Sequence, residues 1–181
     1  MPDTADKLKR LVAVATQLNS TFQLDDLLQL IMSAAAELLE ARSGSLLLLD
    51  EETNELVFRV ASAEPELVGH RMPSDRGIAG HALQQDKAVV ISDASKDERF
   101  YRDVDEAIGS ATENLIAVPL LANNKTLGVV EVMNKKQGSF TADDEELAVA
   151  LASLAAVAIE NAAMYARLAD AVVTARMSYR L

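Results

Sequence analysis

The amino-acid sequence predicts an α+β fold in which helices pack on the faces of a central antiparallel sheet. Two helix-spaced apolar patterns precede residue 40, short apolar runs separated by turn residues fill the middle, and a long helical pattern closes the chain. Strands joined by short turns pair antiparallel, and the flanking helices then cover the sheet. The 181 residues are enough for one domain with its own hydrophobic core.

The first two elements are predicted to be helices. Residues 6–18 carry apolar side chains three and four positions apart, and the polar residues 19–21 interrupt them. A second apolar stripe runs from Leu27 to Leu39, with acidic residues in its first turn. We expect Ser43-Gly44 to end this second helix.

The middle of the chain is predicted to form the sheet. The predicted strands cover residues 45–50, 56–61, 67–72, 88–91, 115–121 and 126–133. Polar turns at 51–54 and 122–125 join two hairpins, and a short helix is expected at 77–85. The polar stretch from Ser92 to Ser110 is predicted to be a long functional loop containing a short helix, because structureless loops of this length are uncommon.

The last predicted element is an exceptionally long helix that starts at Thr141. Thr141 and Asp144 resemble a capping box, and no Gly or Pro follows before Arg176. Roughly 35 residues at 1.5 Å rise span about 50 Å, more than a small domain is wide. Residues of a heptad seam follow at alternating steps of four and three: Leu147, Leu151, Leu154, Ala158, Asn161, Tyr165, Leu168, Val172 and Ala175.

This seam predicts two kinds of packing. We expect its first half, residues 147–159, to cover the sheet of its own domain. Beyond Ala163 the domain offers no further surface, so we expect this part to pair with a second copy of the chain, alongside the N-terminal helix. The sequence therefore predicts a homodimer.

Composition excludes several classes of protein. There are 17 Lys and Arg residues against 28 Asp and Glu residues, a net charge of −11, so the chain lacks the basic face of a nucleic-acid binder. No Cys is present, which excludes disulfides, thiolate chemistry and thioether-linked chromophores. No apolar run approaches the roughly 18–20 residues of a membrane span, and no secretion signal is visible. We expect a cytoplasmic protein with no membrane or nucleic-acid partner.

Motifs for catalysis or metal binding are equally weak. There is no GxSxG or SxxK pattern, and the two His residues, His70 and His81, lie in unrelated settings. The carboxylates of residues 143–146 are adjacent and suit a helix start. We therefore expect neither an enzyme nor a metal site. A binding module is a better candidate, because the 92–110 loop could cover a pocket, although a solvated polar connection explains its composition equally well.

Five ordered segments resemble the GAF domain, a sensory module related in fold to PAS. These are Arg76-Gly77-Ile78-Ala79-Gly80-His81-Ala82, Ile91-Ser92-Asp93-Ala94, Asp97-Glu98-Arg99-Phe100, Asn114-Leu115-Ile116-Ala117-Val118-Pro119-Leu120 and Gly128-Val129-Val130-Glu131-Val132-Met133-Asn134-Lys135. The resemblance covers about residues 24–165 and implies a PAS-like GAF fold with long N- and C-terminal helices. It implies an N-terminal dimerisation helix over 1–22, a GAF domain over 23–163 and a C-terminal signalling extension over 164–181.

One motif is similar to the NKxnFx3DE signature of GAF domains in cyclic-nucleotide phosphodiesterases and adenylyl cyclases. Its residues here are Asn134, Lys135, Phe140, Asp144 and Glu145. In that family the motif is thought to support the fold through a Lys–Asp ion pair, here Lys135 with Asp144, and not to contact the ligand. Such a pair would join the end of a strand to the start of the last helix.

The same resemblance implies a ligand pocket. Ile78 and Ala79 would lie near the phosphate and ribose of a nucleotide, at a helix N-terminus suited to an anion. Ligand-contacting positions of such domains also correspond to Ser45, Asp105, Thr112 and Glu131. Along the lid, however, Ile108-Gly109-Ser110-Ala111-Thr112-Glu113 replaces the usual T-G-Y/F-x-T-R, so a hydroxyl, the aromatic ring and the Arg are lost.

These observations predict a regulatory module that binds a small ligand, with cAMP or cGMP as the leading candidate. Closure of the lid would shift the paired terminal helices. The alternative is a ligand-independent dimerisation and relay module of a multidomain bacterial sensor, its pocket filled by its own side chains. No covalent cofactor is expected. GAF-fold sulfoxide reductases depend on Cys, which this chain lacks, and the end of the sequence within a helix favours a longer parent chain with an effector domain.

Overall fold

The computed structural model describes residues 3–21, 23–99 and 112–178. Within these residues a single sheet has the strand order β3-β2-β1-β6-β5-β4, and every neighbouring pair is antiparallel. The strands are β1 (Ala41–Asp50), β2 (Glu55–Ala61), β3 (Arg71–Pro73), β4 (Val89–Ile91), β5 (Leu115–Ala122) and β6 (Lys125–Lys135). The helices are α1 (Thr4–Ser20), α2 (Leu24–Leu38), α3 (Gly77–Gln85) and α5 (Ala142–Ser178), with short 3₁₀ turns η1 (Pro65–Leu67) and η2 (Ala94–Lys96).

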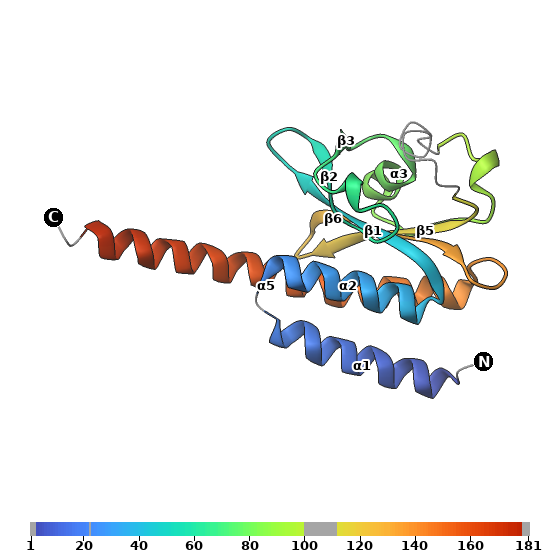
Figure 1. Cartoon of the computed structure of the whole chain (residues 1–181), viewed down its shortest axis with the longest axis horizontal. Coiled ribbons are helices and arrows are strands. Elements are labelled where there is room, and N and C mark those ends of the chain that lie inside the picture. The colour runs from blue at the N-terminus through green and yellow to red at the C-terminus, as the bar shows by residue number, and fades with distance from the viewer. Residues whose placement is uncertain (1–2, 22, 100–111, 179–181) are drawn as a thin grey trace.

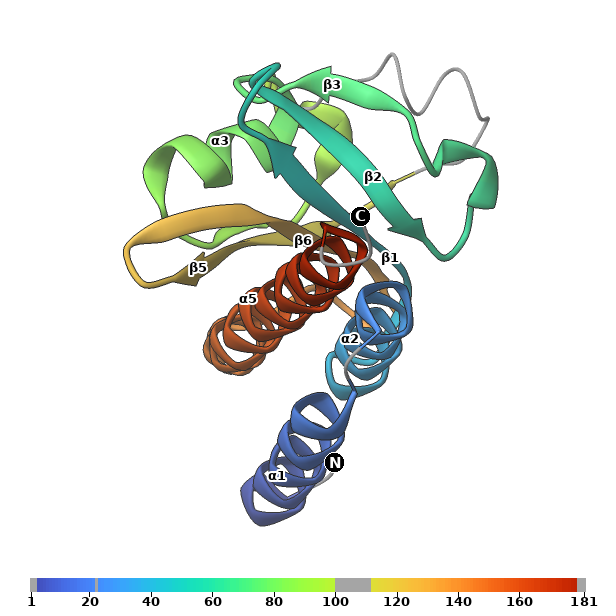
Figure 2. The same ribbon diagram turned by 90° about the vertical axis from the view of Figure 1, so that its left-hand side faces the viewer.

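The elements form layers on either side of the sheet. Helices α2 and α5 lie side by side against one face, with α1 outside them, and α3 lies on the opposite face (Figures 1 and 2). The far part of α5 extends well beyond the sheet (Figure 1). The predicted α+β fold, a central antiparallel sheet flanked by helices with long helices at both ends, is confirmed.

The sheet separates two hydrophobic cores. Leu46 and Val130 point into the core beneath α2 and α5, whereas Leu47 and Val129 point into the core beneath α3. Because the central strands β1 and β6 are covered on both faces, β1 is a continuous Leu run without alternation. The α3 core is the one that surrounds the candidate site described below.

Helix α5 changes its environment halfway along its length. Small residues at its buried positions, such as Ala148, Ala152 and Ala155, bring it close to the sheet. From Met164 to Ser178 every side chain is exposed, as expected. In the half of the seam expected to cover the sheet, Leu151 and Ala158 are buried, but Leu154 is exposed, and the buried stripe also includes the following positions, such as Ala152 and Ala155.

One sequence expectation about α5 needs correction. By length and composition, a window of 18 residues in α5 is apolar enough to cross a membrane, with a mean hydropathy of 1.8. Half of that window is buried inside the domain, and the core helix of a soluble protein has the same properties. The packing face of α5 contributes to the apolar composition of this window.

Two predicted boundaries are also wrong. Helix α2 ends at Leu38 and β1 begins at Ala41, so Ser43 and Gly44 lie within the strand and do not end the helix. The chain reverses at Glu40, whose φ is 52°, a left-handed conformation that a Glu does not signal in advance. The predicted strand at 67–72 is instead η1 followed by the shorter β3, because Pro65 starts a 3₁₀ turn and Gly69 adopts a φ of 91°.

Other local predictions are confirmed. Helix α3 has the predicted bounds 77–85. Asn123 and Asn124 form the β5–β6 turn with φ of 51° and 59°, typical of a two-residue hairpin. The capping box at α5 is reciprocal: the Asp144 N–H donates to Thr141 Oγ1 at 3.2 Å, and the Thr141 N–H donates to Asp144 Oδ2 at 2.8 Å.

Candidate ligand-binding site

A cavity of about 70 Å³ lies between the sheet and the start of α3. Its walls come from β1, β2, β6, the segment before η1 and the first turn of α3. Five of the six predicted ligand residues line it: Ser45, Ile78, Ala79, Thr112 and Glu131. The sixth, Asp105, lies outside the described residues. The fold thus brings positions far apart in sequence to one cavity.

Ser45 and Glu131 are paired across the two central strands. The β1–β6 register places them directly opposite each other, and Ser45 Oγ donates to Glu131 Oε2 at 3.3 Å. Alternation along β6 sends Glu131 to the cavity face while Val130 and Val132 enter the core beneath the helices. Ser45 is buried, so its hydroxyl orients the carboxylate from within the sheet.

Thr112 stands where the chain re-enters the described structure before β5. Its hydroxyl donates to the sulfur of Met133 at 3.9 Å, and both residues line the cavity. The predicted lid, residues 92–112, begins with η2, where Asp93 caps the turn by accepting the Ser95 N–H. Residues 100–111 of that predicted lid lie outside the described residues.

The first turn of α3 forms another wall of the cavity. Gly77 has a φ of 67°, which turns the chain into the helix, and Ile78 and Ala79 are buried at the cavity. Arg76, at the N-cap, makes no side-chain capping bond to this helix end. The first backbone N–H groups of a helix have no partner within the helix and carry its positive dipole end. This wall is therefore suited to a phosphate or another anion.

Sequence reasoning missed one acidic residue of the lining. Glu64 lies between β2 and η1 and is among the residues that line the cavity. Its Oε1 atom is buried and has no hydrogen-bond partner among the described residues. No pattern in the sequence distinguishes Glu64 from the other polar residues of this connection, because only the tertiary fold directs its side chain inward.

The signature residues lie away from the cavity and tie β6 to α5. Lys135 Nζ lies 2.8 Å from Asp144 Oδ1, so the ion pair that the resemblance implied is present, and both side chains are nearly buried. Lys135 Nζ also donates to the Leu39 carbonyl at 3.0 Å and lies 5.6 Å from the Phe140 ring centroid. These contacts connect the end of α2, the end of β6 and the start of α5.

Asn134 and Glu145 complete this motif region. Asn134 adopts a φ of 61°, and its Oδ1 accepts the Glu113 N–H at 2.8 Å, beside the cavity residue Thr112. The Glu145 N–H donates to the Thr141 carbonyl in the first turn of α5. The motif therefore fixes the strand end and the residues that lead into β5, while its side chains stay outside the cavity lining.

Opposing effects act on the pKa of Asp144. Burial raises it, but the hydrogen bond from Lys135, those from Thr141 and the attraction of the Lys135 charge together outweigh burial. The net effect holds the pKa of Asp144 below its ordinary value of 3.8. Asp144 is therefore ionised at neutral pH, which suits its pairing with Lys135.

A comparison with protein-family models matches residues 23–160 to the GAF domain. This match covers most of the chain, including the whole of the sheet, the cavity lining and nearly all of both cores. The chain belongs to the GAF domain family. GAF domains are typically regulatory or sensory domains.

Among curated proteins, the chain is similar to a probable 3',5'-cyclic phosphodiesterase, pde-5, of Caenorhabditis elegans. The two are 31% identical over an alignment of 146 residues, and the match covers 75% of this chain and 20% of the relative. The chain thus spans about a fifth of the length of that phosphodiesterase.

Solved structures show the same GAF fold. The GAF domain of an Acinetobacter phosphoenolpyruvate-protein phosphotransferase is 27% identical, with a TM-score of 0.76 over 91% of this chain and 97% of that one. The corresponding domain from Coxiella burnetii has a TM-score of 0.83 at 20% identity, covering 92% and 99%. A free methionine-R-sulfoxide reductase from Neisseria meningitidis has a TM-score of 0.75 at 19% identity, covering 91% and 95%, a likeness of fold alone.

Proposed function

We propose that this GAF domain is a regulatory sensor that binds a cyclic nucleotide, cAMP or cGMP, in the cavity beneath α3. The observation that carries the proposal is the meeting of Ser45, Thr112 and Glu131 with the first turn of α3 around one cavity. The relative from C. elegans, named a probable cyclic phosphodiesterase, supports a cyclic nucleotide as the ligand class.

Two parts of the cavity lining suit the two ends of a cyclic nucleotide. The N-terminal turn of α3 would hold the cyclic phosphate through backbone N–H groups, since anions bind there without a basic side chain. The carboxylates and hydroxyls on the sheet side would contact the ribose and base. No step of bond making or breaking is assigned to these residues, and we propose that the domain itself is not an enzyme.

Signal output would pass along β6. Glu131 faces the cavity, and Lys135, four residues later on the same strand, holds the start of α5 through Asp144. Closure of the predicted 92–112 lid over a bound ligand would therefore shift the start of the long helix. We propose that α5 and α1 pair with those of a second copy, in the cytoplasm, and pass this change to an effector domain of a longer parent chain.

A second candidate function is a relay dimer that binds no small ligand. It is favoured by the exposed apolar side chains of α5, such as Leu168 and Val172, which would support pairing whether or not the cavity is used. In that case the domain transmits movement between neighbouring domains through its helices alone.

A thermal-shift series with cAMP and cGMP tests the proposal. A ligand at 100 times its dissociation constant stabilises a protein by about 2.7 kcal/mol, which at this size raises the Tm by roughly 5–10 °C. We expect a saturable shift with at least one nucleotide, after unfolding and refolding to remove any bound compound. Glu131→Ala should reduce the shift, while Glu113→Ala, an exposed neighbour of Thr112, should not. No shift with either nucleotide would favour the relay dimer.

A further inference from the structure

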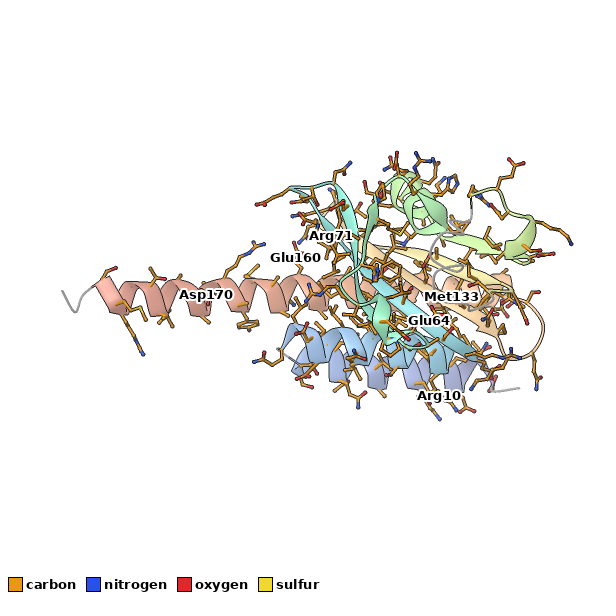
Figure 3. The ribbon with its side chains drawn as sticks, turned by 45° about the horizontal axis from the view of Figure 1, so that its top comes forward. Arg10, Glu64, Arg71, Met133, Glu160 and Asp170 are labelled. Atoms are coloured by element: carbon orange, nitrogen blue, oxygen red, sulfur yellow. The ribbon has the colours of Figure 1, made fainter. Side chains whose placement is uncertain are left out.

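The methionines of the cavity lining carry a further inference, because this chain has no Cys and holds all its sulfur in methionine. Two of the six methionines, Met72 and Met133, line the cavity. Figure 3 shows Met133 on the sheet, away from the projecting part of α5 that carries Asp170. Met133 follows Glu131 by two residues in β6, so strand alternation places both side chains on the α3 face of the sheet. An oxidisable side chain therefore belongs to the lining of the candidate site.

Met133 differs in its surroundings from the other methionines that the structure describes. Met32 and Met72 are only 3% and 6% exposed, and they belong to the two hydrophobic cores. Met164 and Met177 lie on the surface of α5, away from the cavity, and are 55% and 68% exposed. Met133 is half-buried, because it packs against the core beneath α3 and keeps part of its surface in contact with solvent. A small oxidant in solution can therefore reach Met133 in the folded domain.

A hydroxyl donor already faces the sulfur of Met133. Thr112 Oγ1 donates to Met133 Sδ at 3.9 Å, and this contact joins β6 to the residues that lead into β5. A thioether sulfur is a weak acceptor, whereas the oxygen of a sulfoxide is the negative end of a polar S–O bond and accepts more strongly. The separation leaves room for an oxygen atom bonded to the sulfur to lie within hydrogen-bond distance of Oγ1. A donor for the oxidised side chain is thus in place.

We propose that Met133 is an oxidation site, at which hydrogen peroxide converts the thioether to a sulfoxide that the Thr112 hydroxyl holds. A lone pair of the sulfur attacks one peroxide oxygen, and an S–O bond forms as the O–O bond breaks. The released hydroxide takes the proton of the transferred oxygen and leaves as water. The sulfur loses two electrons and the peroxide gains them. Reductases restore the thioether from methionine sulfoxide, so the modification is reversible.

Oxidation of Met133 changes the candidate site in two ways. It adds an oxygen atom to the wall of a cavity of only about 70 Å³, and it converts a flexible apolar side chain into a polar one. Both changes alter the shape and polarity that a ligand meets, so nucleotide binding is expected to weaken. The oxidation itself is independent of the proposed function, whereas this consequence for the ligand rests on it.

Peptide mass spectrometry after brief treatment with dilute hydrogen peroxide tests the site. The background protein carries Met164→Leu and Met177→Leu, so that the exposed methionines of α5 do not consume the oxidant. We expect Met133 to gain one oxygen atom about tenfold or more faster than Met32 and Met72, which become accessible only when the domain opens locally. Equally slow oxidation of all three methionines would overturn the inference.

The isosteric variant Thr112→Val, made in the same background, tests the hydrogen bond to the sulfoxide. Without the hydroxyl the new oxygen loses its donor, so we expect peroxide to lower the Tm of this variant by about 2 °C or more beyond its effect on the background. The matched control is Thr174→Val, which removes an exposed hydroxyl on α5 and should respond to peroxide like the background. An equal change of Tm in Thr112→Val and the background would overturn the role of Thr112.

Titration calorimetry with cAMP and cGMP, before and after peroxide, measures the effect on the ligand site. We expect oxidation to weaken nucleotide binding by the background about tenfold or more. The affinity of Met133→Leu, which offers no sulfur at this position, should be the same before and after peroxide. The matched control Met32→Leu, in the core beneath α2 and α5, should stay as sensitive as the background.

The outcomes separate the two proposals. Unchanged affinity in protein whose Met133 is fully oxidised would overturn the effect on the ligand site. Binding of neither nucleotide before peroxide treatment would overturn the proposed function, while the mass spectra and the Tm values still decide whether Met133 is the oxidation site.

Discussion

The contacts of Lys135 join three parts of the fold: the end of α2, the end of β6 and the start of α5. Its ammonium group reaches the Asp144 carboxylate, the Leu39 carbonyl and the Phe140 ring, with only 11% of the side chain exposed. A charge so far removed from water is tolerated because its donors are matched. Its partner Asp144 caps α5 with its other oxygen, so the loss of either side chain would leave a buried group unpaired.

Replacing Asp144 with Asn is therefore expected to destabilise the domain. The amide keeps the shape and can still accept the Thr141 N–H, but Lys135 is left as an unpaired charge. Removing one partner of a buried pair costs about 3 kcal/mol or more. Urea denaturation at pH 7 should show this loss as a lower midpoint with an unchanged slope. The matched control is Asp143→Asn, an exposed neighbour, which should cost less than about 1 kcal/mol.

The same pair gives the stability a pH dependence of known sign. The pKa of Asp144 is lowered in the folded state, so its contribution is complete above the unfolded value near 3.8 and is lost as the pH falls through the lower folded value. The difference in stability between wild type and Asp144→Asn should thus be constant from pH 7 to about pH 5 and shrink below about pH 4. A difference that grew on acidification would contradict this account.

Only some residues of the cavity lining could be predicted from the sequence. Ser45, Thr112 and Glu131 could be proposed only through the resemblance to a known family, and strand alternation then accounts for the direction of Ser45 and Glu131, which lie in β1 and β6. Glu64 could not, since it lies in an irregular connection where neither period nor motif predicts the direction of a side chain. Asp105, also proposed from the resemblance, lies outside the described residues.

At the scale of elements, local signals and long-range pairings differ in how far they could be predicted. Helix α3 was predictable because Gly77 precedes a compact apolar pattern, and the β5–β6 hairpin because two Asn residues suit its turn. The start of β1 was not, since Glu40 reverses the chain without Gly or Pro. No local sequence pattern predicts the pairing of β1 with β6, although this pairing forms the centre of the sheet and places Ser45 opposite Glu131.

Gly128 is where this central pairing is tightest. It lies opposite Leu48 of β1, and a Cβ atom placed on it would overlap the Leu47 carbonyl oxygen and lie 2.9 Å from the Leu48 Cα. Both neighbours are backbone atoms, so the strands would have to separate. We expect Gly128→Ala to lower the free energy of unfolding by about 2 kcal/mol, the typical cost of overpacking, as measured by urea denaturation.

A second glycine provides the comparison for this prediction. Gly138 has a φ of 73°, and a Cβ atom placed on it would meet no heavy atom within 4 Å. Gly138→Asn therefore adds a residue that tolerates the left-handed conformation without a clash. This variant should change the stability by less than about 1 kcal/mol. Equal stability of both variants and the wild type would show that β1 and β6 have room to adjust.

At the scale of the whole molecule, the sheet separates the cavity from the long helix that we propose as the output element. The cavity lies on the α3 face, whereas α2 and α5 cover the other face (Figure 2). In the proposed function, a change at the cavity would have to cross or run along the sheet to reach the long helix. Two contacts are available for this on opposite ends of the β5–β6 hairpin. Lys135 holds the start of α5, and Asn123 at the hairpin turn donates to Glu160 Oε2 at 2.8 Å. A shift of the hairpin would therefore act on α5 at two points.

The projecting part of α5 is predicted to be a dimer interface, and a shift of the hairpin would act on this part of the helix. Tyr165, Leu168 and Val172 form one stripe at steps of three and four, and each is more than half exposed in the single chain. Leu168→Asp or Val172→Asp would bury a charge in a paired helix, so we expect a monomer by light scattering where the wild type is a dimer. Ala166→Asp places the same charge away from this stripe, on the side of the helix that continues the buried face of Ala155 and Ala162, and should leave the dimer intact. A monomeric wild type would exclude the interface, and a monomer from Ala166→Asp alone would move it to the other face of α5.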